Sequence, residues 1–178
     1  MKKILLHSCC APCSSSVIER VSKNYEITVL FYNPNIEPEL EYIKRKDEQI
    51  KFLNRLNVPY LNTLYENEEF KTMVANYQDE PENGKRCQFC FEIRLAKTVQ
   101  LAKEKGFDTF GTTLTVSPYK NSEFINQIGL KLADKNKIEY LNLDFKKDNG
   151  YQRSIEIAKA FKLYRQNYCG CITSKGEK

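Results

Sequence analysis

Seven cysteines are the residues of this chain with the clearest capacity for chemistry, and they fall into three short groups. The groups are Cys9, Cys10 and Cys13; Cys87 and Cys90; and Cys169 and Cys171. Long intervals separate the groups, so only the folded chain could bring them to one place. Thiolates are ligands for zinc, iron and iron–sulfur clusters. An odd cysteine count without an export signal argues against a disulfide framework, so we expect a metal site.

The spacing within each group differs. Cys87 and Cys90 form a CxxC pair, which by itself fits a redox pair, half a zinc site or part of a cluster site. Neighbours in an extended segment point to opposite sides, so Cys9 and Cys10 would reach different irons or two adjacent centres. Cys169 and Cys171 would point the same way, with a glycine between them that permits close backbone approach.

The number of thiols exceeds what one metal centre needs. A mononuclear zinc site takes four ligands and would leave three of the seven thiols over. A 4Fe-4S cluster also takes four, and the other three could hold a neighbouring ion. We therefore expect an iron–sulfur cluster with a second metal ion. Zinc with spare buried cysteines is the alternative.

Composition places these cysteines in an ordinary globular chain. Its 178 residues suffice for one core, and 41% are hydrophobic. The net charge of +5 tolerates a polyanionic partner without requiring one. The apolar run at residues 4–6 is too short for a signal peptide, and the longest apolar stretches are strand-sized. We expect a cytoplasmic protein without a membrane partner.

The elements that must position the cysteines alternate between strand and helix. Ser14 and Ser15 are expected N-caps of the first helix. The apolar face of the second helix is expected to carry Leu40, Ile43, Ile50, Leu53 and Leu56. Apolar patterning predicts strands at 3–7, 26–32, 59–64, 108–114 and 138–143, and helices after Pro12 to about 23, from Pro38 to about 56, at 90–105, 121–135 and 153–163.

This alternation predicts an α/β fold with a doubly wound, mostly parallel sheet and helices on both faces. We expect one domain over residues 1–178, in which the cysteine-bearing loop 78–90 and the C-terminal segment 164–178 close the metal site. Ligands of such folds bind beyond the carboxyl ends of the strands, where Cys9 and Cys10 follow the first strand. His7 and Thr112 end two strands at the same edge. His7 would donate a proton or a hydrogen bond there, although a backbone contact is an equal alternative.

Five ordered motifs resemble those of the QueH-type epoxyqueuosine reductases. They are residues 7–13 (HSCCAPC), 32–36 (YNPNI), 86–90 (RCQFC), 117–121 (SPYKN) and 164–171 (YRQNYCGC). The resemblance covers nearly the whole chain. It implies an oxidoreductase that removes the epoxide oxygen from epoxyqueuosine at the wobble position of tRNA, the last step of queuosine biosynthesis. It also implies a 4Fe-4S cluster beside a single iron ion, and a fold like that of the adenine-nucleotide α-hydrolases (HUP).

From this resemblance we assign the cysteines and the surrounding side chains. The cluster would take Cys10, Cys87, Cys90 and Cys171, and the second iron would take Cys9, Cys13 and Cys169. His7, Tyr164 or water would supply protons. The residues expected to contact the tRNA substrate are Arg94, Thr112, Tyr119, Lys120 and Arg165. The reaction would also need an external low-potential electron donor.

Two other functions remain open. One is an ATP-dependent tRNA-modifying enzyme of the same fold, which would need a Gly/Ser-rich phosphate loop after the first strand, where Cys9-Cys10-Ala11-Pro12-Cys13 stands instead. The other is a zinc-stabilised tRNA-binding module. The absorbance of the anaerobically purified protein near 400 nm would separate an iron–sulfur protein from a zinc protein.

Overall fold

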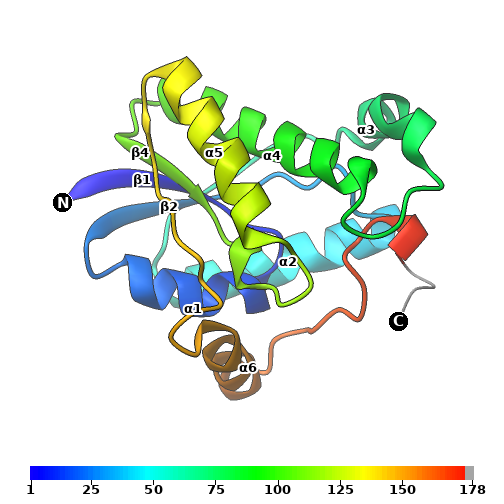
Figure 1. Cartoon of the computed structure of the whole chain (residues 1–178). Coiled ribbons are helices and arrows are strands. Elements are labelled where there is room, and N and C mark those ends of the chain that lie inside the picture. Colours follow the sequence, from blue (N-terminus) through cyan, green and yellow to red (C-terminus); the bar gives the residue numbers. More distant parts are fainter. Residues whose placement is uncertain (175–178) are drawn as a thin grey trace.

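A computed structural model describes residues 1–174 as a parallel sheet between two layers of helices (Figure 1). The strands are β1 (Lys2–His7), β2 (Tyr25–Phe31), β3 (Tyr60–Asn62), β4 (Thr109–Thr112) and β5 (Glu139–Tyr140). They lie in the order β3-β2-β1-β4-β5, and every pairing is parallel. The predicted doubly wound α/β fold is thereby confirmed.

Alternate residues of β1 serve the two faces of the sheet, as the two-residue period of a strand requires. Ile4 and Leu6 pack against helices α1, α2 and α6, whereas Leu5 packs under α4 with Phe110 of β4. The helices are α1 (Ala11–Val21), α2 (Glu39–Arg55), α3 (Asn67–Val74), α4 (Lys85–Glu104), α5 (Ser122–Asn136) and α6 (Gly150–Phe161). Figure 1 shows α1 and α6 on one side of the sheet and α4 and α5 on the other.

The topology places a crevice at the carboxyl ends of β1 and β4. The chain runs outward from β1 to β2 and β3, then crosses to β4 on the other side of β1, so its direction of travel switches between these two strands. His7 pairs in register with Thr112 at the ends of β1 and β4. Loops that leave a parallel sheet at such a switch point diverge and leave room for a ligand. The first three cysteines follow β1, and residues 117–120 follow β4.

Three helices begin earlier than predicted, among them α6, which starts at Gly150 and not at residue 153. α1 starts at Ala11 with Cys10 as its N-cap, so the predicted capping by Ser14 and Ser15 is wrong. Both hydroxyls instead donate to main-chain carbonyls three residues back, Ser14 to that of Ala11 at 3.0 Å. α4 starts at Lys85 and not near Cys90. The prediction placed the start too late, because the first turn of the helix carries polar residues that show no apolar period. Cys87 and Cys90 therefore both lie on the helix.

The buried face of α2 agrees only in part with the predicted one. Leu53 is 1% exposed and Leu56 packs against the same core, as predicted, whereas Leu40 is 78% exposed and Ile43 is 44% exposed. Arg45 and Gln49 are buried instead. Gln49 accepts a hydrogen bond from the Ser8 hydroxyl at 2.7 Å. Apolar spacing thus predicts the buried side near the end of the helix, while polar partners at the crevice decide it in the earlier turns.

Within residues 1–174 no helix has the length and apolarity needed to cross a membrane. The last four residues of the predicted closing segment, 175–178, lie outside the described residues.

Candidate metal and substrate site

The first cysteine group lies at the N-terminus of α1. The sulfurs of Cys9, Cys10 and Cys13 all lie within 4.8 Å of one another, and those of Cys9 and Cys10 are 3.8 Å apart. The unpaired N–H groups of a helix N-terminus carry partial positive charge, which favours thiolates. Three converging sulfurs at this position form a site that can hold a metal ion.

These three thiols influence one another's ionisation. Hydrogen bonds from Cys10 and Cys13 lower the pKa of Cys9 well below its usual value. Hydrogen bonds to Cys10 and Cys9 in turn raise the pKa of Cys13 well above it. The hydrogen bond of Cys13 lowers the pKa of Cys10, but Cys9 and burial outweigh it, and the value rises to about 12. A bound cation would let all three ionise, as metal ligation requires.

The other two groups meet at the start of α4. Cys87 and Cys90 from that helix, and Cys169 and Cys171 from the C-terminal segment, line one small cavity, which we call the Cys87 cavity. The main-chain N–H of Asn83 donates to the Cys87 sulfur at 3.3 Å. Burial raises the pKa of Cys90 to about 12. Four thiols therefore converge here from two segments that are far apart in sequence.

Contacts with α2 and the loop before it hold the C-terminal segment in place. Arg45 Nη1 donates to the carbonyl of Cys169 at 3.0 Å, and its Nη2 donates to the carbonyl of Tyr168 at 3.2 Å. The Gly170 carbonyl accepts from the N–H of Glu37 at 2.8 Å. The Tyr168 hydroxyl donates to the Glu37 carbonyl. These bonds fix the main chain on both sides of the Cys169–Cys171 pair.

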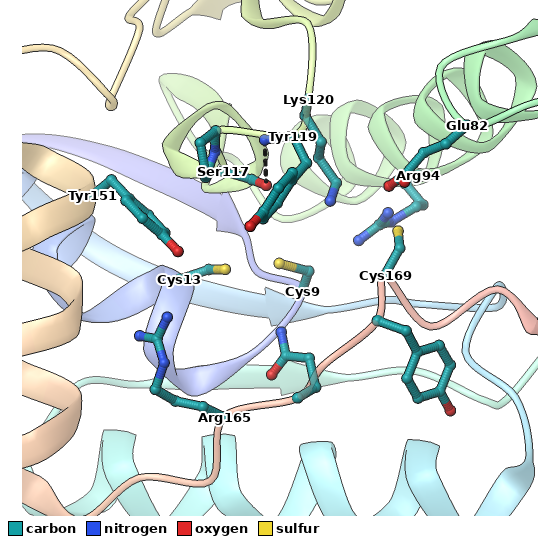
Figure 2. A pocket seen from close by; sticks show the side chains of 13 residues that line it. Cys9, Cys13, Glu82, Arg94, Ser117, Tyr119, Lys120, Tyr151, Arg165 and Cys169 are labelled. Atoms are coloured by element: carbon teal, nitrogen blue, oxygen red, sulfur yellow. Dashed lines mark hydrogen bonds between the residues drawn. The ribbon is translucent and has the colours of Figure 1, made fainter. Parts of the chain in front are cut away.

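A larger cavity of about 90 Å³ opens beside the Cys87 cavity, and we call it the Cys9 cavity. Cys9, Cys13 and Cys169 line it, and Figure 2 shows their sulfurs with Tyr119, Lys120, Arg165 and Arg94 around them. Four of the five residues predicted to contact substrate therefore lie here. Cys169, Lys120 and Glu82 line both cavities, so the two are adjacent.

Several residues of this lining were not predicted from the sequence. Tyr151, in the first turn of α6, has its hydroxyl near Cys13 in Figure 2, and Glu82 extends from the loop before α4. Gln166 Nε2 donates to the Cys10 sulfur at 3.0 Å. No local pattern marks Tyr151, because only the packing of α6 on α1 brings it to the cysteines. Gln166 lies within the motif 164–171, so that motif was the available signal.

His7 and Thr112 contact each other beneath the site. His7 Nδ1 lies 3.0 Å from the Thr112 hydroxyl, and its Nε2 lies 3.0 Å from the carbonyl of Tyr32. The Thr112 oxygen also accepts from the N–H of Leu114. These partners are satisfied when Thr112 donates to Nδ1 and Nε2–H donates to Tyr32, the tautomer that we assign. Burial, aided by the nearby Arg94, lowers the pKa of His7 to about 3.

Neither of these two residues lines the Cys9 cavity. Their positions therefore do not favour proton donation by a charged His7 or substrate contact by Thr112. Tyr164 does not line the Cys9 cavity either. Its hydroxyl lies 3.1 Å from both carboxylate oxygens of Glu41, and Lys44 stacks on its ring. Its predicted role as a proton donor stays a prediction that its position does not support.

Two cations lie among the sulfurs, the buried Arg94 and the half-buried Lys120. Burial lowers the pKa of Lys120, but negative charge on Cys169, Cys9 and Cys13 outweighs burial and raises it. The same balance holds for Arg94, with Cys90, Cys9 and Cys169 as the sulfurs that raise its pKa. A set of soft thiolate donors at two helix N-termini with adjacent cations fits iron, zinc or an iron–sulfur cluster, and does not resemble a site for a hard cation such as Mg²⁺.

Relatives named for one enzyme match this chain over nearly its whole length. The chain is 43% identical to epoxyqueuosine reductase QueH of Staphylococcus epidermidis over 96% of its own length and 75% of the relative. It is 37% identical to the same enzyme of Thermotoga maritima over 98% of its length and 91% of the relative.

Among solved structures, the U34-tRNA thiolase NcsA from Methanococcus maripaludis, described with its [4Fe-4S] cluster, aligns with a TM-score of 0.54 at 14% identity. The alignment covers 93% of this chain and 58% of NcsA, and at that identity it shows a shared fold alone. The family model described as epoxyqueuosine reductase QueH matches residues 4–177. The chain therefore belongs to the QueH family of epoxyqueuosine reductases.

Proposed function

We propose that this chain reduces epoxyqueuosine to queuosine at the wobble position of tRNA. The observation that carries the proposal is the meeting of all three cysteine groups at the β1/β4 crevice, next to a cavity lined by cations and tyrosines. Loss of the epoxide oxygen to give an alkene consumes two electrons and two protons and releases water. The chain must therefore hold a redox centre, receive electrons from an external low-potential donor and present protons to the oxygen.

We assign the centre as a 4Fe-4S cluster with an adjacent iron. The Cys87 cavity contains three of the four ligands assigned to the cluster, namely Cys87, Cys90 and Cys171. The Cys9 cavity contains all three ligands assigned to the second iron, namely Cys9, Cys13 and Cys169. When bound, these groups would supply single electrons and a Lewis acid. Cys10 fits this division less well, because it lies with Cys9 and Cys13 while Cys169 borders both cavities.

The side chains of the Cys9 cavity suit a nucleotide that has left an anticodon loop. Tyr119 is 56% exposed and offers a face on which a base can stack. Arg165 and Lys120 offer positive charge for flanking phosphates. The hydroxyl groups of Tyr119 and Tyr151 lie inside the cavity, where they can donate hydrogen bonds to the epoxide oxygen (Figure 2). Since tRNA is the substrate, we place the reaction in the cytoplasm.

The two alternative functions predict different observations. The segment after β1 is Cys9-Cys10-Ala11-Pro12-Cys13, which lacks the glycines of a phosphate loop and so does not support ATP chemistry. A zinc-stabilised tRNA-binding module would be colourless and would not turn over epoxyqueuosine.

The decisive experiment is anaerobic turnover of epoxyqueuosine-containing tRNA with a low-potential reductant, with queuosine detected by mass spectrometry. We expect conversion by the iron-loaded protein. Removal of iron by a chelator should abolish conversion, and reloading with iron and sulfide should restore it. Activity that survives complete iron removal would reject the proposed redox centre, and the absence of any turnover by iron-loaded protein would reject the proposed reaction.

A further inference from the structure

Arg94 is a charged side chain in the interior of this protein. It is 1% exposed and lies on α4, one turn after Cys90. Taking a guanidinium out of water costs several kcal/mol unless an anion compensates the charge. Among residues 1–174 no Asp or Glu lies within ion-pair distance of Arg94. Buried Arg45, by contrast, pairs with Glu41 at 2.6 Å.

The contacts of Arg94 satisfy some of its hydrogen atoms without supplying a negative charge. Nη2 donates to the side-chain oxygen of Asn33 at 2.6 Å, and Nη1 lies 3.7 Å from the sulfur of Cys90. Nε lies 3.4 Å from His7 Nε2, which in the assigned tautomer carries a hydrogen and accepts nothing. Arg86, another buried arginine without a carboxylate partner, differs because it donates to the main-chain carbonyls of Gln78 and Glu80. These bonds to the loop before α4 explain why Arg86 is buried.

The sulfurs are the anions within reach of Arg94. It lines the Cys9 cavity with Cys9 and Cys169, and it touches Cys90, so it faces one cysteine from each of the three groups. In a low-dielectric interior such charges act on one another strongly. A phosphate of tRNA would have to enter the protein to reach a side chain that is buried this deeply.

We propose that Arg94 is the internal counter-cation of the cysteine site and not a contact for the tRNA backbone. On the proposed iron–sulfur function, it stabilises the more negative, reduced state of the loaded site. Arg94 is thus a positioning and charge-compensating residue that acts through sulfur and does not touch substrate.

The first test measures the reduction potential of the iron-loaded protein by spectroscopic redox titration. It needs no tRNA and so does not depend on turnover. We expect Arg94→Gln to shift the potential to more negative values, because the reduced state loses a buried positive charge. Arg94→Lys, which keeps the charge, should recover most of that shift. Arg153→Gln is the control and should keep the parent potential, because Arg153 of α6 is exposed and pairs with Glu19 of α1.

A second variant keeps the proposal testable if Arg94→Gln does not fold. Asn33→Asp changes one atom and places a carboxylate against Nη2 of Arg94. In iron-loaded protein it should shift the reduction potential in the same direction, because the new carboxylate offsets the guanidinium charge.

The salt dependence of tRNA affinity separates a counter-cation of the sulfurs from a contact to a tRNA phosphate. If Arg94 compensates sulfur charge, Arg94→Gln should leave this salt dependence unchanged. An unchanged reduction potential in folded Arg94→Gln would overturn the proposal, as would a salt dependence weakened by the equivalent of one phosphate contact. Turnover by the parent protein tests the proposed function separately.

Discussion

Arg45 of α2 donates from Nη1 to the main-chain carbonyl of Cys169 at 3.0 Å, although 124 residues separate the two in sequence. Its side chain is 1% exposed and is ion-paired with Glu41 at 2.6 Å. The C-terminal cysteines thus depend for their position on a charged residue of a helix that contributes no thiol.

Arg45→Gln should detach the C-terminal segment from α2. We expect a loss of about 3 kcal/mol of unfolding free energy, since Glu41 is left without its partner. We also expect faster hydrogen exchange at 168–171 and reduced iron retention. Arg55→Gln, on the exposed last turn of the same helix, is the matched control. Iron retention and exchange equal to the parent in the Arg45 variant would contradict this role.

The backbone geometry of the C-terminal segment should require glycine at position 170. Its φ is +125°, and a Cβ there would lie 2.8 Å from Ile36 Cγ1 and 3.1 Å from Arg45 Nη1. We expect Gly170→Ala to cost about 1–3 kcal/mol and to lower iron content. Gly106→Ala provides the control, because Gly106 also has positive φ but a Cβ there meets nothing within 4 Å. It should lose about 1 kcal/mol and keep its iron.

The cysteine assignments can be separated by single substitutions. Alanine variants of Cys10, Cys87, Cys90 and Cys171 should lose the cluster, whereas variants of Cys9, Cys13 and Cys169 should lose only the second iron. Iron and sulfide counting with Mössbauer spectra measures both centres. Cys10 and Cys169 form the critical comparison, because Cys10 lies with Cys9 and Cys13. Cluster loss in Cys169→Ala and retention in Cys10→Ala would exchange their roles, and full retention of both centres in Cys13→Ala would remove Cys13 from the ligand set.

The features of this site that could be predicted are those that leave a pattern among neighbouring residues of the sequence. The strand–helix alternation and the position of Cys9 after β1 are local, so the fold and the edge that holds the site could be predicted. Lys120 and Arg165 were found because they belong to motifs. Arg45 could not be recognised as a buried residue of the site, because a charged residue on an amphipathic helix indicates a solvated face. Its contacts with the C-terminal segment depend on the tertiary fold and leave no local pattern in the sequence. Tyr151 was missed because its place depends on how two helices pack.

Tyr151 should matter more to turnover than Tyr164. Its hydroxyl lies in the Cys9 cavity near Cys13, whereas that of Tyr164 is bound to Glu41 (Figure 2). We expect Tyr151→Phe to lower turnover by about 10- to 100-fold, as loss of a group that hydrogen-bonds to the reacting oxygen would. Iron content should stay at the parent value in both variants. A larger loss of turnover in Tyr164→Phe would restore the proton-donor role predicted from sequence.

Arg165 should bind the tRNA backbone. It lines the mouth of the Cys9 cavity, and among residues 1–174 no carboxylate lies within ion-pair distance of it. Arg165→Gln should therefore weaken tRNA affinity and reduce the slope of log affinity against log salt by about 0.7, the value for one lost phosphate contact to an unpaired strand. Lys2→Gln provides the control, because Lys2 lies at the amino end of β1, away from the cavity, and pairs with Glu139. Filter binding of unmodified tRNA over a salt series measures both variants without turnover. If the slopes of the two variants agree with the parent, Arg165 contacts no phosphate.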